Sequence, residues 1–254
     1  MRGFKLEQIE LGHRAVGAAS PPLTFAHLSD LHLRRWGRRH ELMVETINAC
    51  SVDFVFVTGD VITRGAEGLE RAGWLLRRLR CQHGVFAVRG NWEVDCAPPL
   101  REFRSIACDW GTTLLVNESR VVVTRAGRVR VIGVDDLNRG WLDLAASLAS
   151  SAGDVEFCVL LSHVPLVVRL LPPGHGVGLV LSGHTHGGQV RLPVVWPLLL
   201  PRGHAGFVSG FYDLGTVRLY VSRGFGGVGI VPLRLRCPAE VTLVRVLPQP
   251  EGGR

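Results

Sequence analysis

Side chains of the types that bind divalent metal ions follow five apolar runs in this sequence of 254 residues. The runs are "LTFAHLSD" (23–30), "VDFVFVTGD" (52–60), "GVFAVRGN" (84–91), "VEFCVLLSH" (155–163) and "VGLVLSGH" (177–184). Each run stops at Asp, Asn or His, and a further histidine follows two positions after the first and the last of these residues. The candidate ligands are therefore Asp30, His32, Asp60, Asn91, His163, His184 and His186.

This set of ligands is too large for a single zinc ion, which needs only three or four protein ligands. It favours two metal ions that share one carboxylate, and Asp60 is the expected bridge. Carboxylate, amide and imidazole groups together suit Mn²⁺, Fe or Zn²⁺, and they suit Mg²⁺ less well. Two ions about 3.5–4 Å apart clamp phosphate oxygens and generate hydroxide at neutral pH. The residue types therefore predict hydrolysis of a phosphate ester, with Mn²⁺ as the first metal to test.

The elements that must position these side chains can be predicted from the hydropathy pattern. Short apolar runs of this kind are typical of buried strands. Stretches with helical periodicity lie between some of them, at 40–50, 67–81 and 140–153. Strands that alternate with helices predict an α/β domain with a parallel or mixed sheet, whose ligands bind beyond the carboxyl ends of the strands. An Asp or Asn after a strand is ordinarily a turn former, but five such endings are hard to reach by turn chemistry alone.

The polar endings resemble, in the same order, a known series of motifs. "SDLH" (29–32), "TGD" (58–60), "GNWE" (90–93), "SH" (162–163) and "GHTHGGQ" (183–189) are similar to the D-x-H, G-D, G-N-H-[DE], H and G-H-x-H motifs of the calcineurin-like metallophosphoesterases. The resemblance implies two mixed β-sheets packed as a sandwich and flanked by helices. It also implies that Asp30, His32 and His186 hold one metal, that Asn91, His163 and His184 hold the other, and that Asp60 bridges them.

One position departs from the family pattern. Trp92 stands where many members have a histidine that contacts the scissile phosphate or protonates the leaving group. Indole has no proton that titrates in the useful range, and a general acid typically contributes about 10²–10⁴-fold in rate. Three interpretations stay open: a leaving group that needs no acid, such as the phosphate of a phosphoanhydride; a proton from another histidine; or a weakly active relative. The other histidines considered are His27, His83, His175 and His204.

Two further acidic motifs lie close to the predicted ligands. Glu93 follows Trp92, and it is expected to orient the site from behind or to lie on the surface. Asp135 and Asp136 end a sixth apolar run, "VRVIGVDD", and they either face the same crevice or form a turn. The residues expected to take part in catalysis are Asp60, Asn91, Trp92 and Glu93.

Candidate substrate-binding residues come from basic and apolar segments. Arg34 and Arg35 in "LRRWGRRH" (33–40) follow the first ligands directly, and a guanidinium pairs bidentately with phosphate. Arg223 lies in the glycine-rich "SRGFGGVG" (222–229), and Trp196 in "VVWPLLLP" (194–201) suits an interfacial contact. The alternatives are solvated charge, a turn and a loop that covers the edge of the sandwich. The later segments, 187–215 and 219–246, resemble a branch of the family that includes bacterial membrane-associated phosphoesterases and a UDP-2,3-diacylglucosamine pyrophosphatase of lipid A synthesis.

Composition sets the remaining expectations. We expect an N-terminal extension (1–22), one metallophosphoesterase domain (23–247) and a disordered tail (248–254). The net charge is +7, but Lys5 is the one lysine among 29 basic residues, so the arginine excess reflects either codon usage or an anionic partner. The cysteines lack metal-type spacing and are expected to be reduced. With neither a signal peptide nor an 18-residue apolar run, we expect a cytoplasmic monomer, peripheral at most to the inner membrane face.

The sequence thus predicts a bimetallic phosphoesterase that acts on a phosphodiester or phosphoanhydride, with a lipid-linked or nucleotide-linked substrate such as UDP-2,3-diacylglucosamine. One alternative is a nuclease or cyclic-nucleotide phosphodiesterase, although no strip of alternating basic and aromatic residues indicates nucleic acid. The other alternative is a catalytically weak scaffold that keeps the fold and binds partners.

Overall fold

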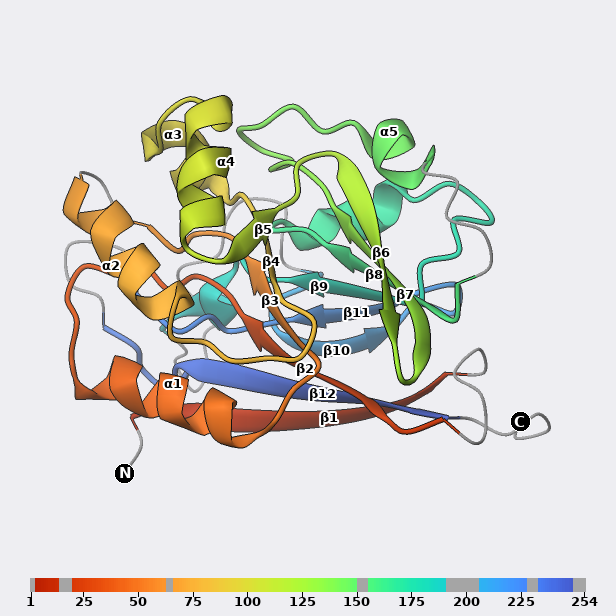
Figure 1. Cartoon of the computed structure of the whole chain (residues 1–254), viewed down its shortest axis with the longest axis horizontal. Coiled ribbons are helices and arrows are strands. Elements are labelled where there is room, and N and C mark those ends of the chain that lie inside the picture. The colour runs from red at the N-terminus through yellow and green to blue at the C-terminus, as the bar shows by residue number, and fades with distance from the viewer. Residues whose placement is uncertain are drawn as a thin grey trace.

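Two six-stranded sheets make up the centre of the molecule (Figure 1). The computed structural model describes residues 3–13, 20–62, 66–149, 155–190, 206–227 and 233–248. The first sheet has the strand order β1-β12-β2-β3-β4-β5, and the second has the order β10-β11-β9-β8-β7-β6. Both are mixed: β12 runs antiparallel to β2 in the first sheet, and β10 and β6 run antiparallel to their neighbours in the second.

The strands are short, as expected for elements that a sandwich buries. Those of the first sheet are β1 (Lys5–His13), β2 (Leu23–Leu28), β3 (Phe54–Thr58), β4 (Val85–Val88), β5 (Thr112–Leu114) and β12 (Glu240–Pro248). Those of the second sheet are β6 (Glu118–Thr124), β7 (Gly127–Gly133), β8 (Phe157–Leu161), β9 (Leu179–Ser182), β10 (Gly210–Asp213) and β11 (Arg218–Val221).

Helices cover the outer faces of both sheets. They are α1 (Arg38–Ala49), α2 (Ala66–Leu76), α3 (Asn91–Cys96), α4 (Leu100–Asp109) and α5 (Leu144–Ala149), with two 3₁₀ turns, η1 (Pro165–Leu170) and η2 (His186–Gly188). Buried side chains of α1, α2 and α4 pack on the first sheet, and those of η1 pack on the second. The described helices contain none that is long and apolar enough to cross a bilayer.

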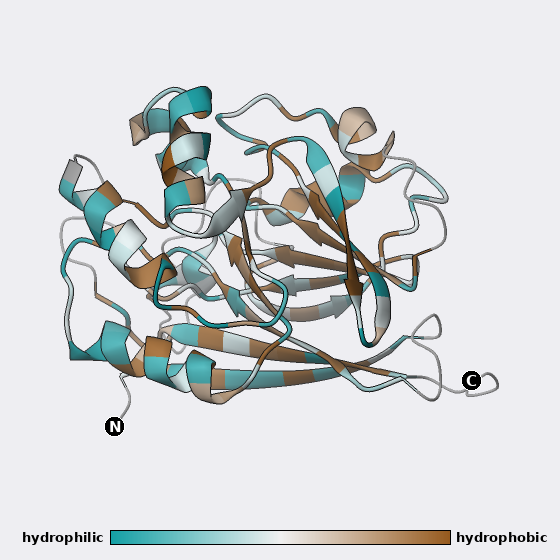
Figure 2. Ribbon diagram, in the orientation of Figure 1, coloured by the Kyte–Doolittle hydropathy of each residue, from teal (hydrophilic) through white to brown (hydrophobic). Residues whose placement is uncertain are grey.

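The core between the sheets explains why the strands form where they do. Alternate residues of β2, β3 and β4, including Phe25, Phe54 and Phe86, face the side chains of β8, β9 and β11. The intervening residues, such as Ala26 and Val55, face the helices instead. These strands are therefore largely apolar on both faces, which accounts for their hydrophobic runs, and most of the central ribbons are brown in Figure 2.

The sandwich confirms the fold class expected from the sequence. All five apolar runs form strands, and the stretches at 40–50 and 67–81 become α1 and α2. The segment assigned to an N-terminal extension contributes β1, which pairs in parallel with β12 at the edge of the first sheet. The disordered tail expected from 248 lies outside the described residues, apart from Pro248 at the end of β12. The described cysteines are all free thiols.

Candidate metal centre

The carboxyl ends of β2 and β3 bring the first candidate ligands together. The segments that follow these two strands stay side by side, because Asp30 N–H donates to Gly59 O at 3.0 Å and His32 N–H donates to the carbonyl of Asp60 at 3.0 Å. Asp30, His32 and Asp60 adopt left-handed backbone conformations, with φ between 42° and 54°. Non-glycine residues rarely adopt this conformation, and such strain clusters at functional sites. The loops therefore turn sharply to aim these side chains into one space.

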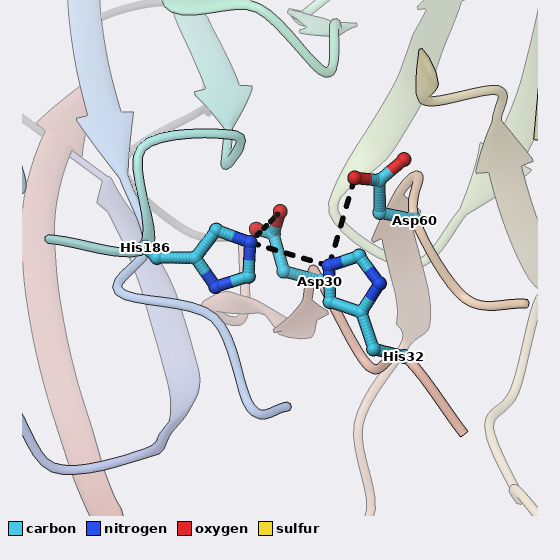
Figure 3. A group of neighbouring side chains, drawn as sticks. All are labelled: Asp30, His32, Asp60 and His186. Atoms are coloured by element: carbon cyan, nitrogen blue, oxygen red, sulfur yellow. Dashed lines mark hydrogen bonds and ion pairs between the residues drawn. The ribbon is translucent and has the colours of Figure 1, made fainter. Parts of the chain in front are cut away.

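The first donor group consists of Asp30, His32, Asp60 and His186, whose side chains point toward one another in Figure 3. All four are buried, and their candidate ligand atoms lie within 4.8 Å of one another. His32 Nε2 is 3.2 Å from His186 Nε2 and 3.6 Å from Asp60 Oδ2, and His186 Nε2 is 3.3 Å from Asp30 Oδ1. Two carboxylates and two imidazoles at these spacings match the donor set of a divalent transition-metal ion.

The second donor group consists of Asn91, His163 and His184, and it adjoins the first through Asp60. His163 Nε2 lies 3.3 Å from Asp60 Oδ2 and 3.2 Å from Asn91 Oδ1. His184 Nδ1 lies 3.1 Å from Asn91 Oδ1 and 3.1 Å from His163 Nε2. One oxygen of Asp60 thus contacts a histidine of each group.

The hydrogen bonds of the imidazoles fit metal binding. His163 Nδ1 is 2.7 Å from the carbonyl of Thr58, which can only accept, so the ring donates there and turns the lone pair of Nε2 toward Asp60 and Asn91. His184 Nε2 lies 3.2 Å from the side-chain amide of Asn138, and an amide turned so that its oxygen accepts from Nε2–H would leave the Nδ1 lone pair toward the second group. Convergent lone pairs repel one another unless a cation or a proton lies between them. The two groups therefore suit a pair of divalent ions.

The pKa values of the clustered side chains also indicate a metal site. Burial raises the pKa of Asp30 to about 6 and lowers the pKa of His32 to about 4. Burial also opposes ionisation of Asp60 and His163, but their mutual attraction prevails, and it lowers the pKa of Asp60 and raises that of His163. Metal binding requires ionised carboxylates and neutral imidazoles. Bound cations would replace the proton that His163 shares with its carboxylate neighbours.

Two glycines make room for these carboxylates. A Cβ on Gly183 would lie 1.9 Å from Ser29 Oγ and 2.2 Å from Asp30 Oδ2, and a Cβ on Gly90 would lie 2.3 Å from Asp60 Oδ1. No side chain fits at either position unless the carboxylate moves. The glycines of "GNWE" and "GHTHGGQ" are therefore steric requirements of the site.

Glu93 lies behind the cluster and holds its loops. The side chain is 3% exposed, and its two oxygens accept four backbone N–H groups: Asp60 and Gly90 donate to Oε2, and Val61 and Ile62 donate to Oε1. Both oxygens are thus occupied by the chain itself. Glu93 fits the expectation of a residue that orients the site, and not that of a surface glutamate.

Trp92 stands beside the first donor group. Its ring lies edge-on to His32, with centroids 5.5 Å apart, and its backbone N–H donates to Asp60 Oδ1 at 2.9 Å. The alternative proton donors are poorly placed. Burial lowers the pKa of His27 to about 3 and keeps it neutral, while His83 and His175 precede β4 and β9 at the opposite, amino ends of the strands. His204 lies outside the described residues.

The structure places the candidate substrate-binding residues in different surroundings. Arg34 and Arg35 line a cleft that also includes His32. Arg223 instead forms ion pairs with Glu7 at 2.5 Å and Glu240 at 2.6 Å. Trp196 and the apolar segment 194–201 lie outside the described residues.

Asp135 and Asp136 serve mainly in local structure. Arg89 forms a bidentate pair with Asp135, through 2.9 Å and 2.6 Å contacts. One oxygen of Asp136 accepts from the backbone of Asn138 and Arg139, which makes a turn. The Asp136 carboxylate still lies close enough to His163 to help raise the pKa of that histidine.

Sequence reasoning did not single out Asn138 and Arg234. Asn138 contacts His184, and Arg234 reaches His186 Nδ1 at 3.4 Å. Each is more than 40 residues from its histidine in the chain, with separations of 46 and 48. No local pattern marks such contacts, because they depend on loop paths between distant strands.

A family model decides the assignment. The model for calcineurin-like phosphoesterases matches residues 23–188, a span that includes both donor groups. The chain belongs to this family. It is therefore a metal-dependent phosphoesterase by family, and its candidate dimetal site lies at the strand ends where the motifs fall.

Several relatives agree with the family assignment. The Bacillus subtilis metallophosphoesterase YkuE is 30% identical over 220 residues, which cover 85% of this chain and 76% of that protein. A Helicobacter pylori metallophosphoesterase is 32% identical over 231 residues, covering 87% of this chain and 59% of its own length. The Escherichia coli phosphodiesterase YaeI is 32% identical over 140 residues, 54% of this chain and 48% of that protein.

A solved structure shows the same fold. A dimetal phosphatase from Danio rerio superposes with a TM-score of 0.54 at 15% identity, covering 80% of this chain and 88% of that one. At this identity the likeness concerns the sandwich alone.

Proposed function

We propose that this protein hydrolyses a phosphoanhydride or phosphodiester with two divalent metal ions, of which Mn²⁺ is the first choice. The observation that carries the proposal is the pair of donor groups that adjoin at Asp60. In this proposal Asp30, His32 and His186 hold one ion, Asn91, His163 and His184 hold the other, and Asp60 contacts both. Ions bound there would activate a water molecule and neutralise charge on the phosphate.

The protein's own residues would then divide the remaining tasks. Glu93 holds the Asp60 and Gly90 loops at fixed positions through its four backbone bonds. Trp92 limits the space beside His32 and supplies no proton. Because His27, His83 and His175 are poorly placed as acids, the geometry favours substrates whose leaving group departs without protonation. A phosphate leaving group meets this condition far better than an alkoxide.

The substrate that we propose is lipid-linked or nucleotide-linked, with UDP-2,3-diacylglucosamine as the specific candidate. The resemblance of the later segments supports this choice, as does the Bos taurus relative named a transmembrane protein with metallophosphoesterase domain. That relative is 33% identical over 233 residues, covering 85% of this chain and 51% of its own length. Peripheral attachment to an anionic membrane belongs to the same proposal. YaeI, named a phosphodiesterase, supports the phosphodiester alternative.

The test is Mn²⁺-dependent hydrolysis of UDP-2,3-diacylglucosamine and of bis-p-nitrophenyl phosphate. It compares wild type with Asp60→Asn and with Asp109→Asn, a matched change at an exposed position at the end of α4. We expect wild type and Asp109→Asn to cleave both compounds, and Asp60→Asn to cleave neither. Cleavage of the diester alone would reject the lipid nucleotide. If fully metal-loaded wild type cleaved neither compound, the scaffold alternative would replace the enzyme.

A further inference from the structure

A basic cleft opens next to the first donor group. Its volume is about 520 Å³, and its walls include Arg34, Arg35, Arg39 and Arg234. We call these four residues with their surroundings the arginine cleft. Arg34 and Arg35 come from the loop after β2, Arg39 from the first turn of α1, and Arg234 from the segment before β12. Four guanidinium groups from three segments thus face one space, which no stretch of solvated helix charge would produce.

The two inner arginines are oriented by neutral partners. Arg39 donates to the carbonyl of Phe225 at 3.3 Å and lies over the Phe225 ring at 4.6 Å. Arg234 donates to the carbonyls of Gly226 and Arg223, at 2.7 Å and 2.8 Å. Carbonyl oxygens fix the planes of the guanidinium groups without forming an ion pair, and Asp30 and Glu240 act on the charge of Arg234 only from beyond ion-pair distance. Burial accordingly lowers the pKa of both arginines.

Across the described ranges, no carboxylate lies within ion-pair distance of Arg35, Arg39 or Arg234. By contrast, Arg38, beside Arg39 in the sequence, pairs with Glu41 at 3.4 Å and Glu45 at 3.0 Å on the outer surface of α1. Arg39 and Arg234 are partly buried, and Arg35 is exposed at the mouth of the cleft. Guanidinium groups without an ion-pair partner favour a bound anion, and their planar forks match phosphate oxygens.

The arginine cleft is continuous with the metal centre. His32 lines the cleft and also belongs to the first donor group. Arg234 reaches Nδ1 of His186, on the opposite side of that ring from Nε2, which faces Asp30. An anion in the cleft would therefore be adjacent to a phosphate at the metals, as the two phosphates of a diphosphate are adjacent.

We propose that the arginine cleft binds the second phosphate of a diphosphate substrate and that this phosphate is the leaving group. The inference rests on the proposed hydrolase function and deepens it. In the reaction, the oxygen of water bonds to the scissile phosphorus, and its proton passes to solvent. The bridging P–O bond breaks, and the bridging oxygen keeps the electron pair as part of the departing phosphate. The guanidinium groups stabilise that charge, so the step needs no proton from position 92.

The test measures binding by calorimetry to the Mn²⁺-loaded protein, with methylenediphosphonate and methylphosphonate as ligands that cannot be hydrolysed. We expect Arg35→Gln to weaken diphosphonate binding at least tenfold and methylphosphonate binding less than threefold. Arg234→Gln should do the same, but Arg234 also bonds to the backbone, so Arg35→Gln carries the test if that variant fails to fold. Arg38→Gln, which removes the same charge outside the cleft, is the matched control.

Equal losses for both ligands in Arg35→Gln, or equal effects of Arg35→Gln and Arg38→Gln, would overturn the inference. Because binding is measured without turnover, its result is independent of whether the protein hydrolyses UDP-2,3-diacylglucosamine. Uridine 5′-diphosphate and farnesyl diphosphate extend the test to nucleotide and lipid sources of the same group. Each of these two ligands that binds the wild-type protein must bind the Arg35→Gln variant at least tenfold more weakly. If either ligand binds both proteins equally well, the inference fails.

Discussion

The two donor groups differ in charge and in burial. Asp30, His32, Asp60 and His186 are all at most 5% exposed, and they include two carboxylates. The second group has an amide, Asn91, in place of a carboxylate of its own, and both Asn91 and His184 are half-buried. A cation attracts carboxylates more strongly than amides, and burial strengthens that attraction. The first group should therefore bind its ion more tightly, while the second should exchange it and remain accessible to substrate and water.

Among changes that act on one group alone or on its surroundings, the largest effect is expected from His32→Ala, which removes a buried ligand of the tighter group. Loss of residues that only support a ligand typically costs 10–100-fold in metal affinity or activity, so loss of a ligand should cost more than about 100-fold in kcat/KM. Metal analysis should show one retained ion in place of two. His175→Ala, at the far end of the sheet, is the control. Full activity in His32→Ala would contradict the assignment of this group.

Glu93→Gln should weaken both groups together, because Glu93 bonds to the loops that carry Asp60 and Asn91. A glutamine has one acceptor oxygen, so at least one pair of buried N–H groups loses its partner, at about 1–3 kcal/mol. We expect activity to fall about 10–100-fold and the melting temperature to fall by about 2–12 °C. A variant as stable and active as wild type would show that the Glu93 bonds do not position the site.

Asn138→Ala should affect the second group alone, because Asn138 contacts His184. Its loss frees the ring to rotate, and we expect about tenfold weaker binding of the second ion, measured by Mn²⁺ titration. The first ion should bind as in wild type. Arg139→Ala, the next position in the chain, serves as a control. Equal weakening of both ions would mean that the groups are not separable.

The smallest effect is expected from Trp92→His, which places an ionisable group beside His32. Hydrolysis of a diester with a poor, alkyl leaving group should rise by about 3–10-fold, a fraction of what an optimised acid supplies. Bis-p-nitrophenyl phosphate, whose leaving group is good, should respond less. A drop with both substrates would show that the indole itself is needed in the site.

The sequence predicted the strand ends well because each apolar run is a local signal. The runs before Asp60 and His163 form β3 and β8, and the ligand after each lies in the cluster. Long-range contacts left no such signal. Arg234 lies in the segment before β12, 48 residues from His186 in the sequence, so no local pattern marked its contact with the first group.

At Arg223 a local sequence signal suggested a role that long-range contacts exclude. A basic residue in a glycine-rich segment suggested phosphate binding, yet two acidic partners from β1 and β12 occupy its guanidinium. Neither strand was among the runs considered in the sequence, so the partners could not be anticipated. One glycine of the same segment, Gly224, contacts the metal centre directly. It packs against Asp30, and a Cβ at this position would lie 2.7 Å from that side chain.

The central claim is that Asp60 serves two metal ions, and a calorimetric Mn²⁺ titration of wild type and Asp60→Asn tests it most directly. The account predicts two binding events for wild type, a tighter one followed by a weaker one, and the loss or marked weakening of both in Asp60→Asn. It also predicts that the spectrum of the loaded wild type shows two coupled Mn²⁺ ions. A single event in wild type, or an Asp60→Asn variant that loses only one of two ions, would contradict the shared site.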